Sequence, residues 1–161
     1  MVSPGARIWV TMNRIKCLTS LNLTPTKFRK RTVVLVVAGL IERDGRILIG
    51  QRKRGDRHAY KWEFPGGKVE QDEDPKTALA RELTEELSIH AKIGPEILRY
   101  EHLYPNGTLI LLIFCRVESF TGEPKNNAFE QILWEQAEHL PKYDFLDGDT
   151  DFVRRLARRE F

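Results

Sequence analysis

The sequence predicts a single domain of the α+β class, in which a mixed β-sheet has a helix packed on each side. Three observations predict this class. Short apolar segments separated by turn residues are typical of strands. Only two segments have helical periodicity, one in the middle of the chain and one at its end. The chain has 161 residues, 41% of them hydrophobic, which is enough for one substantial core and too little for two domains of ordinary size.

Residues 1–31 differ in composition from the rest of the chain. They carry seven basic residues and no acidic residue, whereas the net charge of the whole chain is only +3. An Arg-rich targeting peptide, a nucleic-acid-binding arm and a poorly ordered leader are all compatible with this composition. Because blocks of like charge are usually solvated, we favour a poorly ordered extension and expect no nucleic-acid partner. The folded domain is expected to span residues 32–161.

The composition also argues against a membrane protein and a metal-cysteine protein. No apolar run approaches the roughly 20 residues that a membrane-spanning helix needs, so we expect no membrane partner. Cys17 and Cys115 have neither a nearby cysteine nor a histidine at ligand spacing, so the sequence supports neither a zinc site nor a disulfide framework. We therefore expect a protein of the reducing cytoplasm, as a monomer or homodimer.

The first half of the domain begins with strands. Residues 33–42, VVLVVAGLIE, predict a buried strand, and residues 46–52, RILIGQR, its hairpin partner across an Arg-Asp-Gly turn. Residues 53–61 predict a polar loop. Residues 62–67, WEFPGG, predict an extended segment that ends in a tight turn.

A helix follows this turn. Asp74 fits the N-cap, Pro75 fits the first helical position, and Glu73 favours the positive end of the helix dipole. Ser88 and the β-branched Ile89 mark the end of the helix.

The second half predicts another hairpin and a closing helix. Residues 96–104 and 108–118 are joined by a Pro-Asn-Gly turn, a strong hairpin signal. A further strand is expected around residues 131–134. The last 15 residues, DGDTDFVRRLARREF, predict an amphipathic helix with arginines in its last turns.

The central helix carries three carboxylates on one narrow face. At 100° per residue, Glu82, Glu85 and Glu86 lie within about 100° of one another. An apolar stripe lies beside this face and is expected to pack on the sheet: Leu79, Ala80, Leu83 and Leu87.

The acidic face requires a cation. No lysine lies on it, and the helical wheel places Arg81 beside Glu85 only. Oxygen clusters of this kind suit hard divalent cations, and Mg²⁺ is the usual choice where phosphates complete the coordination shell. A solvated acidic surface is the alternative interpretation of such a triplet taken alone.

The residues around the helix resemble the motif of the Nudix hydrolase family, G-x5-E-x7-R-E-U-x-E-E-x-G-U, where U is aliphatic. Read from Gly67, the chain departs from the motif at one position, where Ser88 stands for the glycine that ends the helix. Serine can end a helix at a modest backbone cost. The segments AGLIERDGRILIGQR, KWEFPGGKVE and YDFLDGDTDFVRRL resemble the MutT-like branch, and the resemblance covers residues 32–158. It implies a mixed sheet between helices and hydrolysis of a nucleoside diphosphate linked to another group, with Mg²⁺ or Mn²⁺.

The resemblance also implies roles for single residues. Metal ligation falls to the carboxylates of Glu82, Glu85 and Glu86 and to the backbone carbonyl of Gly66. Glu73 and Arg81 are expected to orient these carboxylates. Lys68 is expected either to contact a phosphate or to be an ordinary surface residue. The implied reaction is attack of water at the β-phosphorus of a nucleoside triphosphate, giving the monophosphate and pyrophosphate.

The general base has two candidates. MutT-like enzymes have a further glutamate six residues before a strand tryptophan, which here is the position of Ala128 relative to Trp134. A small register shift would bring Glu130 to this place. Otherwise a glutamate of the motif, Glu85, takes the role.

Base selection is expected at Glu63, Phe64 and Asp149, which by resemblance line the base pocket. Carboxylates suit the exocyclic amine of cytosine or adenine, which favours a cytosine or modified-purine nucleotide. The structural alternatives are that Asp149 caps the last helix and that Phe64 belongs to the core. The functional alternatives are another nucleoside-diphosphate-linked substrate and a non-catalytic nucleotide-binding module.

Overall fold

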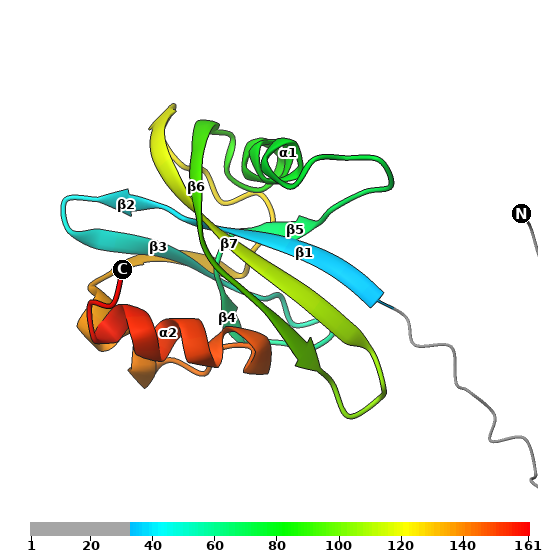
Figure 1. The fold of residues 1–161 in the computed structure, drawn as a ribbon. Helices are drawn as coiled ribbons and strands as arrows, with labels where there is room; N and C mark the ends of the chain where they lie inside the picture. Colours follow the sequence, from blue (N-terminus) through cyan, green and yellow to red (C-terminus); the bar gives the residue numbers. More distant parts are fainter. Residues whose placement is uncertain (1–32) are drawn as a thin grey trace, which may run out of the picture. The chain divides into compact units, whose positions relative to one another are not determined.

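The strands form two four-stranded sheets in residues 33–161, the part of the chain that the computed structural model describes (Figure 1). The first sheet has the order β5 (Gly66–Lys68), β1 (Val33–Leu40), β7 (Leu109–Thr121) and β6 (His90–Leu103). Strand β1 is parallel to β7 and antiparallel to β5, so the sheet is mixed. The α+β class is confirmed. The predictions for residues 1–31 lie outside the described residues.

The second sheet centres on β3 (Arg46–Gln51), which pairs with β2 (Glu42–Arg43), β4 (Trp62–Glu63) and β8 (Gln131–Glu135). The expected strand over 33–42 is therefore wrong as a unit. It is interrupted at Ile41, and only β2 forms the hairpin with β3. Strand β1 instead becomes a central strand, because its apolar residues point to both faces and both faces are covered.

The hairpin of β6 and β7 is confirmed, and both strands are longer than predicted. The register of the pairing shifts three times between Lys92 and Leu98. Pro95 lies in this stretch, where it cannot donate a ladder hydrogen bond. Strand β8 is also confirmed.

Helix α1 (Pro75–Leu87) begins where the sequence predicts. The Asp74 carboxylate accepts the backbone N–H groups of Lys76 and Thr77 at 3.0 and 3.2 Å. Ser88 follows the last helical residue with φ 55°, the left-handed conformation for which the family motif has glycine. The buried side chains are those of the predicted leucines, joined by Ala78, whereas Ala80 is only half-buried.

The C-terminal region holds α2 (Thr150–Ala157), preceded by the 3₁₀ helices η1 (Ala137–Lys142) and η2 (Asp147–Asp149). The closing helix was predicted, and the two 3₁₀ helices were not. Asp149 precedes α2, but its side chain makes no capping hydrogen bond, so the capping alternative for this residue is wrong. No helix in residues 33–161 is long and apolar enough to cross a membrane.

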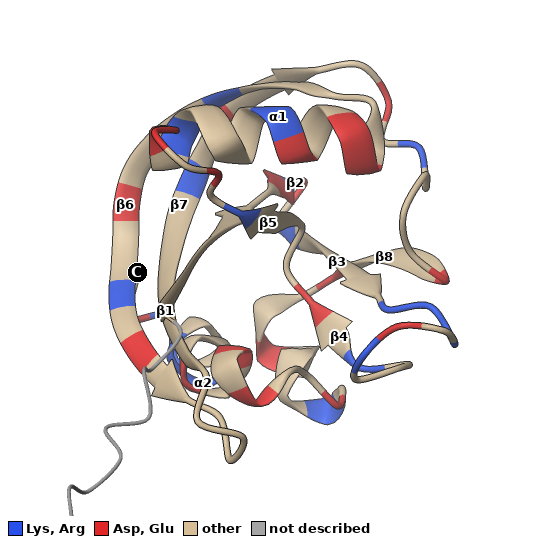
Figure 2. Ribbon diagram, turned by 90° about the vertical axis from the view of Figure 1, so that its right-hand side faces the viewer, with Lys and Arg blue, Asp and Glu red and all other residues tan. Residues whose placement is uncertain are grey.

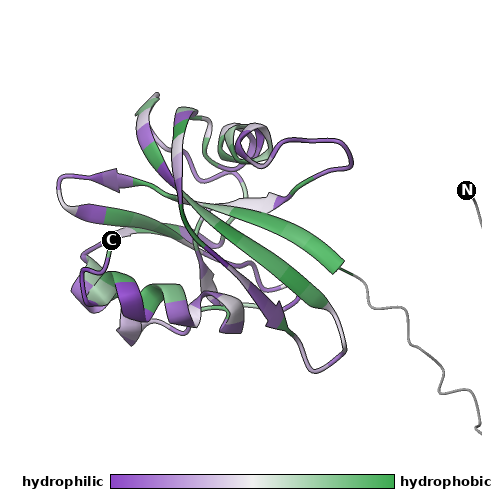
Figure 3. Cartoon of the chain, in the orientation of Figure 1, coloured by the Kyte–Doolittle hydropathy of each residue, from purple (hydrophilic) through white to green (hydrophobic). Residues whose placement is uncertain are grey.

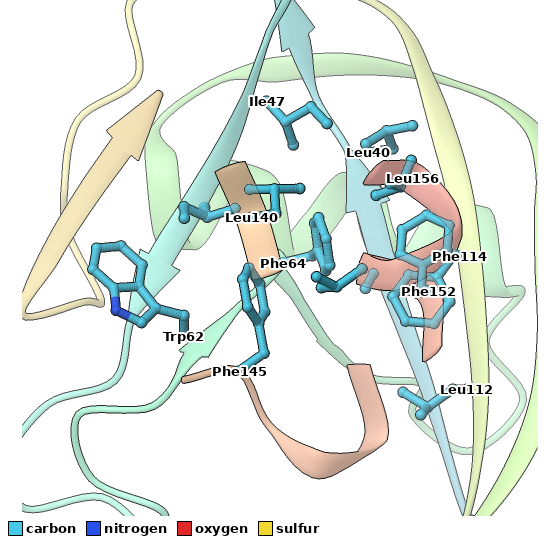
Figure 4. Close-up of a cluster of buried hydrophobic side chains, with 13 residues drawn as sticks. Leu40, Ile47, Trp62, Phe64, Leu112, Phe114, Leu140, Phe145, Phe152 and Leu156 are labelled. Atoms are coloured by element: carbon cyan, nitrogen blue, oxygen red, sulfur yellow. The ribbon is translucent and has the colours of Figure 1, made fainter. Parts of the chain in front are cut away.

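Helices α1 and α2 cover opposite sides of the sheets, and each side has its own apolar core (Figure 1). Strands β1 and β7 between them are strongly hydrophobic (Figure 3). The core on the α2 side is rich in aromatic rings, in which Phe64, Phe114 and Phe152 pack together with centroid distances from 4.0 to 5.9 Å (Figure 4). The core on the α1 side contains the helix leucines and Phe129.

The loop of residues 122–130 is fixed to β3 by Phe129. The ring of Phe129 lies so close to Gly50 that a Cβ atom on Gly50 would be 2.5 Å from it. The backbone N–H of Glu130 donates to the carbonyl of Gln51 at 2.8 Å, and Gln131 is the register partner of Gln51. These contacts fix the register in which the chain enters β8.

Gly50→Ala is expected to lower the free energy of unfolding by about 1–3 kcal/mol, because the added methyl group overpacks the contact with Phe129. Chemical denaturation measures this change as a shift of the midpoint at constant slope. Gly55→Ala is the control, because nothing lies within 4 Å of its added Cβ atom, and its effect should stay within about 0.5 kcal/mol. Equal stabilities of Gly50→Ala and the parent protein would contradict the packing of Phe129 on β3.

Candidate active site

Two adjacent glycines let α1 approach β5. Gly66 has φ 146° and leaves no space for a side chain, because a Cβ atom there would lie 2.2 Å from the carbonyl oxygen of Val37. A Cβ atom on Gly67 would lie 2.5 Å from the carboxylate of Glu82. Gly66 therefore requires glycine, whereas a side chain on Gly67 would push the Glu82 carboxylate aside. Both glycines lie in β5, so the tight turn expected here is wrong, and the chain bends at Pro65 instead. The backbone of β5 and the carboxylates of α1 meet at this place. Figure 2 shows the charged residues of α1 above β5.

Glu86 is the most deeply buried of the three glutamates. Its Oε2 atom accepts the backbone N–H of Gly66 at 3.0 Å. Burial raises the pKa of Glu86 to about 8, and the nearby charges of Glu63 and Glu82 act in the same direction, while the Gly66 hydrogen bond opposes them. The site thus holds more carboxylate charge than the protein alone neutralises.

Arg81 contacts three carboxylates. Its Nη2 atom lies 3.0 Å from Glu73, and its Nη1 atom lies 2.8 Å from Glu82 but 3.6 Å from Glu85. The expectation that Arg81 flanks Glu85 only is therefore wrong, because the long guanidinium group reaches across the helix surface. The hydrogen bond from Arg81 lowers the pKa of Glu73, so this carboxylate stays ionised.

Glu85 and Glu130 stand apart from this arrangement. The Glu85 side chain is 60% exposed, and its ion pair with Arg81 is long. Glu130 is exposed and lies at the start of β8. Within residues 33–161, no three Asp, Glu, His or Cys side chains are gathered closely enough to hold a metal ion, because Glu82 and Glu86 are turned to protein partners.

A cavity of about 400 Å³ opens beside Gly66 and Gly67. Apolar residues of β1 and β7 form part of its lining. All four predicted substrate residues, Glu63, Phe64, Lys68 and Asp149, line it as well. Phe64 also belongs to the aromatic core, so its ring both packs in the core and lines the cavity.

Two carboxyl groups in the cavity have different electrostatic environments. Glu63 accepts both hydrogen bonds of the Arg52 Nη1 atom, at 2.8 and 3.0 Å. Burial nevertheless raises its pKa, and Arg52 opposes this shift. Asp149 is buried without such a partner, and burial raises its pKa to about 8, with the charge of Glu63 acting in the same direction. The cavity therefore offers an ion-paired acceptor and a carboxyl that holds its proton near neutral pH.

Tyr100 holds the segment that carries Asp149. Its hydroxyl donates a short hydrogen bond to the carbonyl of Gly148. Gly148 also lies against Leu112, where an added Cβ atom would be 2.9 Å from the leucine side chain. Asp149 is thus placed by a fixed backbone.

Three residues that the sequence did not predict for the site also line the cavity: Arg52, His58 and Tyr104. The rings of His58 and Tyr104 lie 5.6 Å apart, although the two residues come from different loops. His58 has φ 61°, an uncommon conformation for a residue other than glycine. A lone arginine, histidine or tyrosine in a polar loop carries no sequence signal for such a position.

The chemistry of the α1 carboxylates fits a divalent cation. The donors are oxygens, those of Glu82 and Glu86 are partly buried, and their negative charge is incompletely neutralised, which are the features that Mg²⁺ and Mn²⁺ favour. The backbone of Gly66 adjoins them without an intervening side chain. A cation here would also favour the ionised form of Glu86, whose pKa is raised by burial and, to a smaller extent, by the charges of Glu63 and Glu82.

The comparison with known families agrees with this geometry. Residues 29–156 match the family described as the NUDIX domain. The chain belongs to the Nudix family. Among its Nudix relatives is the CTP pyrophosphohydrolase of Escherichia coli (strain K12), 38% identical over 121 residues, which are 75% of this chain and 89% of that protein.

Two further Nudix proteins extend the comparison. The 8-oxo-dGTP diphosphatase of Haemophilus influenzae is 33% identical over 127 residues, covering 78% of this chain and 93% of that protein. The crystal structure of the MutT NUDIX hydrolase from Burkholderia pseudomallei superposes with a TM-score of 0.68 at 29% identity, covering 76% of this chain and 96% of that one. The MutT-like resemblance is thereby confirmed.

Asp149→Asn is expected to remove a pH dependence of stability from this Nudix domain. The folded protein keeps the Asp149 carboxyl protonated up to its pKa of about 8, whereas the unfolded chain ionises near about pH 4. Below that lower value the contribution of Asp149 to stability is fully present, and it is lost as the pH rises to about 8. The variant lacks this loss, so its stability relative to the parent protein should increase with pH across the window.

Denaturant titrations at several pH values between about 4 and 8 measure this difference. Asp151→Asn is the control, because Asp151 is an exposed residue in the first turn of α2. A stability difference between Asp149→Asn and the parent protein that is constant over the window would contradict the buried, protonated state of Asp149.

Proposed function

We propose that the protein hydrolyses (deoxy)nucleoside triphosphates to the monophosphate and pyrophosphate, with Mg²⁺ or Mn²⁺ as the cofactor. The observation that carries this proposal is that the cavity reaches the place where the α1 carboxylates lie. The cavity that holds Glu63 and Asp149 extends to Gly66 and Gly67, and the carboxylates of α1 lie against the same two glycines. A nucleotide with its base in the cavity would bring its phosphates to the carboxylates.

The carboxylates of Glu82, Glu85 and Glu86 and the carbonyl of Gly66 would hold the cation. When bound, the cation neutralises phosphate charge and lowers the pKa of a water molecule. Arg81 and Glu73 would orient the ligands, since the Arg81 guanidinium already joins Glu73 to Glu82. Lys68 lines the cavity next to Gly66 and Gly67, where its ammonium group would contact a phosphate.

We favour Glu85 over Glu130 as the general base. Glu130 would have to shift in register to reach the position of Ala128. The packing of Phe129 on Gly50 and the backbone bond from Glu130 to Gln51 oppose any such shift. Glu85 is exposed beside the other carboxylates and has only a long contact with Arg81, so its carboxylate can turn towards a water molecule and accept a proton.

The cavity favours a base that presents both donors and acceptors. Glu63, which is paired with Arg52, would accept a hydrogen bond from an exocyclic amine, as cytosine offers. The carboxyl of Asp149, protonated near neutral pH, both donates and accepts, which suits the lactam edge of an oxidised purine. The names of the relatives, a CTP pyrophosphohydrolase and an 8-oxo-dGTP diphosphatase, support both classes of substrate.

The protein is expected to release pyrophosphate from at least one member of a panel of canonical and oxidised (deoxy)nucleoside triphosphates with Mg²⁺. Attack at the β-phosphorus gives the monophosphate and pyrophosphate, so ion-exchange chromatography of the nucleotide product and separate assays for pyrophosphate and orthophosphate measure the outcome. Glu85→Gln combined with Glu86→Gln should lower turnover by about 100-fold or more, because loss of groups that only orient metal ligands already costs about 10–100-fold.

The control for the double variant is Glu101→Gln, which removes one exposed carboxylate of β6 outside the site. Release of orthophosphate alone would refute attack at the β-phosphorus. Full turnover by the double glutamine variant would refute the role of the α1 carboxylates. Turnover confined to another nucleotide-linked diphosphate would keep the site and change the substrate.

Glu130→Gln should leave kcat within about twofold of the parent value, whereas Glu85→Gln should lower it by about 100-fold or more, the usual contribution of a general base. Steady-state kinetics at saturating Mg²⁺ compares the two variants. A large loss of kcat in Glu130→Gln with unchanged KM would reverse the assignment.

A further inference from the structure

The last turn of α1 is held by the loop of residues 122–130. The final carbonyl groups of a helix have no partner within the helix, and α1 has no basic side chain in its last turn. Here the loop supplies the donors. The backbone N–H of Asn127 donates to the carbonyl of Glu86 at 3.0 Å, and that of Lys125 donates to the carbonyl of Leu87 at 2.8 Å.

The side chain of Asn127 completes this contact. Its amide nitrogen donates to the carbonyl of Glu85 at 3.1 Å and to the hydroxyl oxygen of Ser88 at 2.8 Å. A primary amide has two N–H donors, and both are used. Asn127 therefore contacts the backbone of both Glu85 and Glu86, and it binds the residue that ends the helix.

Ser88 is the one departure of this chain from the family motif. A serine at φ 55° has a backbone cost that glycine does not have. Its hydroxyl offers an acceptor that glycine cannot offer, and Asn127 uses it. The loop is also fixed at its other end, where Phe129 packs on Gly50 and the side chain of Asn126 accepts the N–H of Phe129 at 2.9 Å.

We propose that Asn127, paired with Ser88, is a positioning residue that fixes Glu85 and Glu86 for cation binding and proton transfer. This inference rests on the proposed function of these glutamates. Among the hydrogen bonds of residues 33–161, those from the loop to the last turn of α1 come from the loop backbone and from Asn127, so they act on the glutamates through the main chain. Loss of the Asn127 side-chain amide removes two of the hydrogen bonds that hold the end of α1, while Glu63, Asp149 and the rest of the cavity keep their contacts.

Asn127→Ala should lower kcat about 10-fold and weaken Mn²⁺ binding to the nucleotide-free protein about 10-fold, the lower part of the range for groups that orient metal ligands. KM for the nucleotide should stay within about twofold, because the base cavity is untouched. Isothermal titration with Mn²⁺ and steady-state kinetics measure these values. Asn127→Asp, which keeps the size and loses both donors, should behave in the same way.

Asn126→Ala is the matched control. It removes one hydrogen bond of an adjacent asparagine within the same loop, and Asn126 makes no side-chain contact with α1 among the hydrogen bonds of residues 33–161. Its Mn²⁺ affinity should stay within about twofold of the parent value. Asn127→Ala should also weaken Mn²⁺ binding less in a Ser88→Gly background, where one acceptor of the amide is already absent.

Hydrogen exchange of the metal-free protein separates this inference from the proposed function. Asn127→Ala should speed amide exchange in residues 84–89, and Asn126→Ala should not. A parent protein that hydrolyses no nucleotide would overturn the proposed function, while the exchange and Mn²⁺ data would still decide the role of Asn127. Unchanged exchange and unchanged Mn²⁺ affinity in Asn127→Ala, with or without a lower melting temperature, would overturn the positioning role, as would equal effects in Asn126→Ala.

Discussion

The close approach of α1 to Gly66 and Gly67 of β5 is the constraint on which the site depends. A side chain on Gly66 would collide with the backbone of Val37, and one on Gly67 would collide with the carboxylate of Glu82. The first collision would displace β5 from β1, and the second would turn the Glu82 carboxylate out of its place. The hydrogen bond between Gly66 and Glu86 would then break, and Glu86 would enter solvent. The absence of two Cβ atoms therefore sets both the burial of the carboxylates and their distance from the cavity.

This approach gathers negative charge at a cost in stability. Arg81 is the cation that touches Glu73, Glu82 and Glu85, and Glu86 has a backbone N–H as its partner. Burial of a charged group opposes folding, and the pKa of Glu86 is raised mainly by this burial, with the charges of Glu63 and Glu82 adding to it. A bound cation would reverse the sign of this contribution, because a ligand that binds only the folded state stabilises it. The same excess of negative charge that opposes folding of the metal-free protein would favour the binding of a divalent ion.

The elements that the sequence predicted correctly are those whose determinants lie a few residues away in the chain. Asp74, Pro75 and Ser88 mark the ends of α1 through capping rules that involve residues a few positions away, and the β6–β7 hairpin follows from its turn. The predictions failed where a contact between segments that are distant in the sequence determines the structure. The apolar stretch of β1 and β2 has no local signal for its interruption at Ile41, because the parallel pairing of β1 with β7 joins segments about 75 residues apart. The reach of Arg81 to Glu82 and the meeting of His58 with Tyr104 likewise depend on side-chain direction and on loops that fold separately.

Strand β1 explains why the two halves of the site keep a fixed relation. Successive side chains of a strand point to opposite faces, so Val37 packs in the core beneath α1 while Val36 and Ala38 line the cavity on the other side. The same residues pair through the backbone with β5, Val37 with Gly67 and Ala38 with Gly66. The positions of α1 and of the cavity are therefore both fixed by three consecutive residues of β1, Val36, Val37 and Ala38. Because this strand is paired on both edges and covered on both faces, the sheet sets the distance from the cavity to the carboxylates of α1.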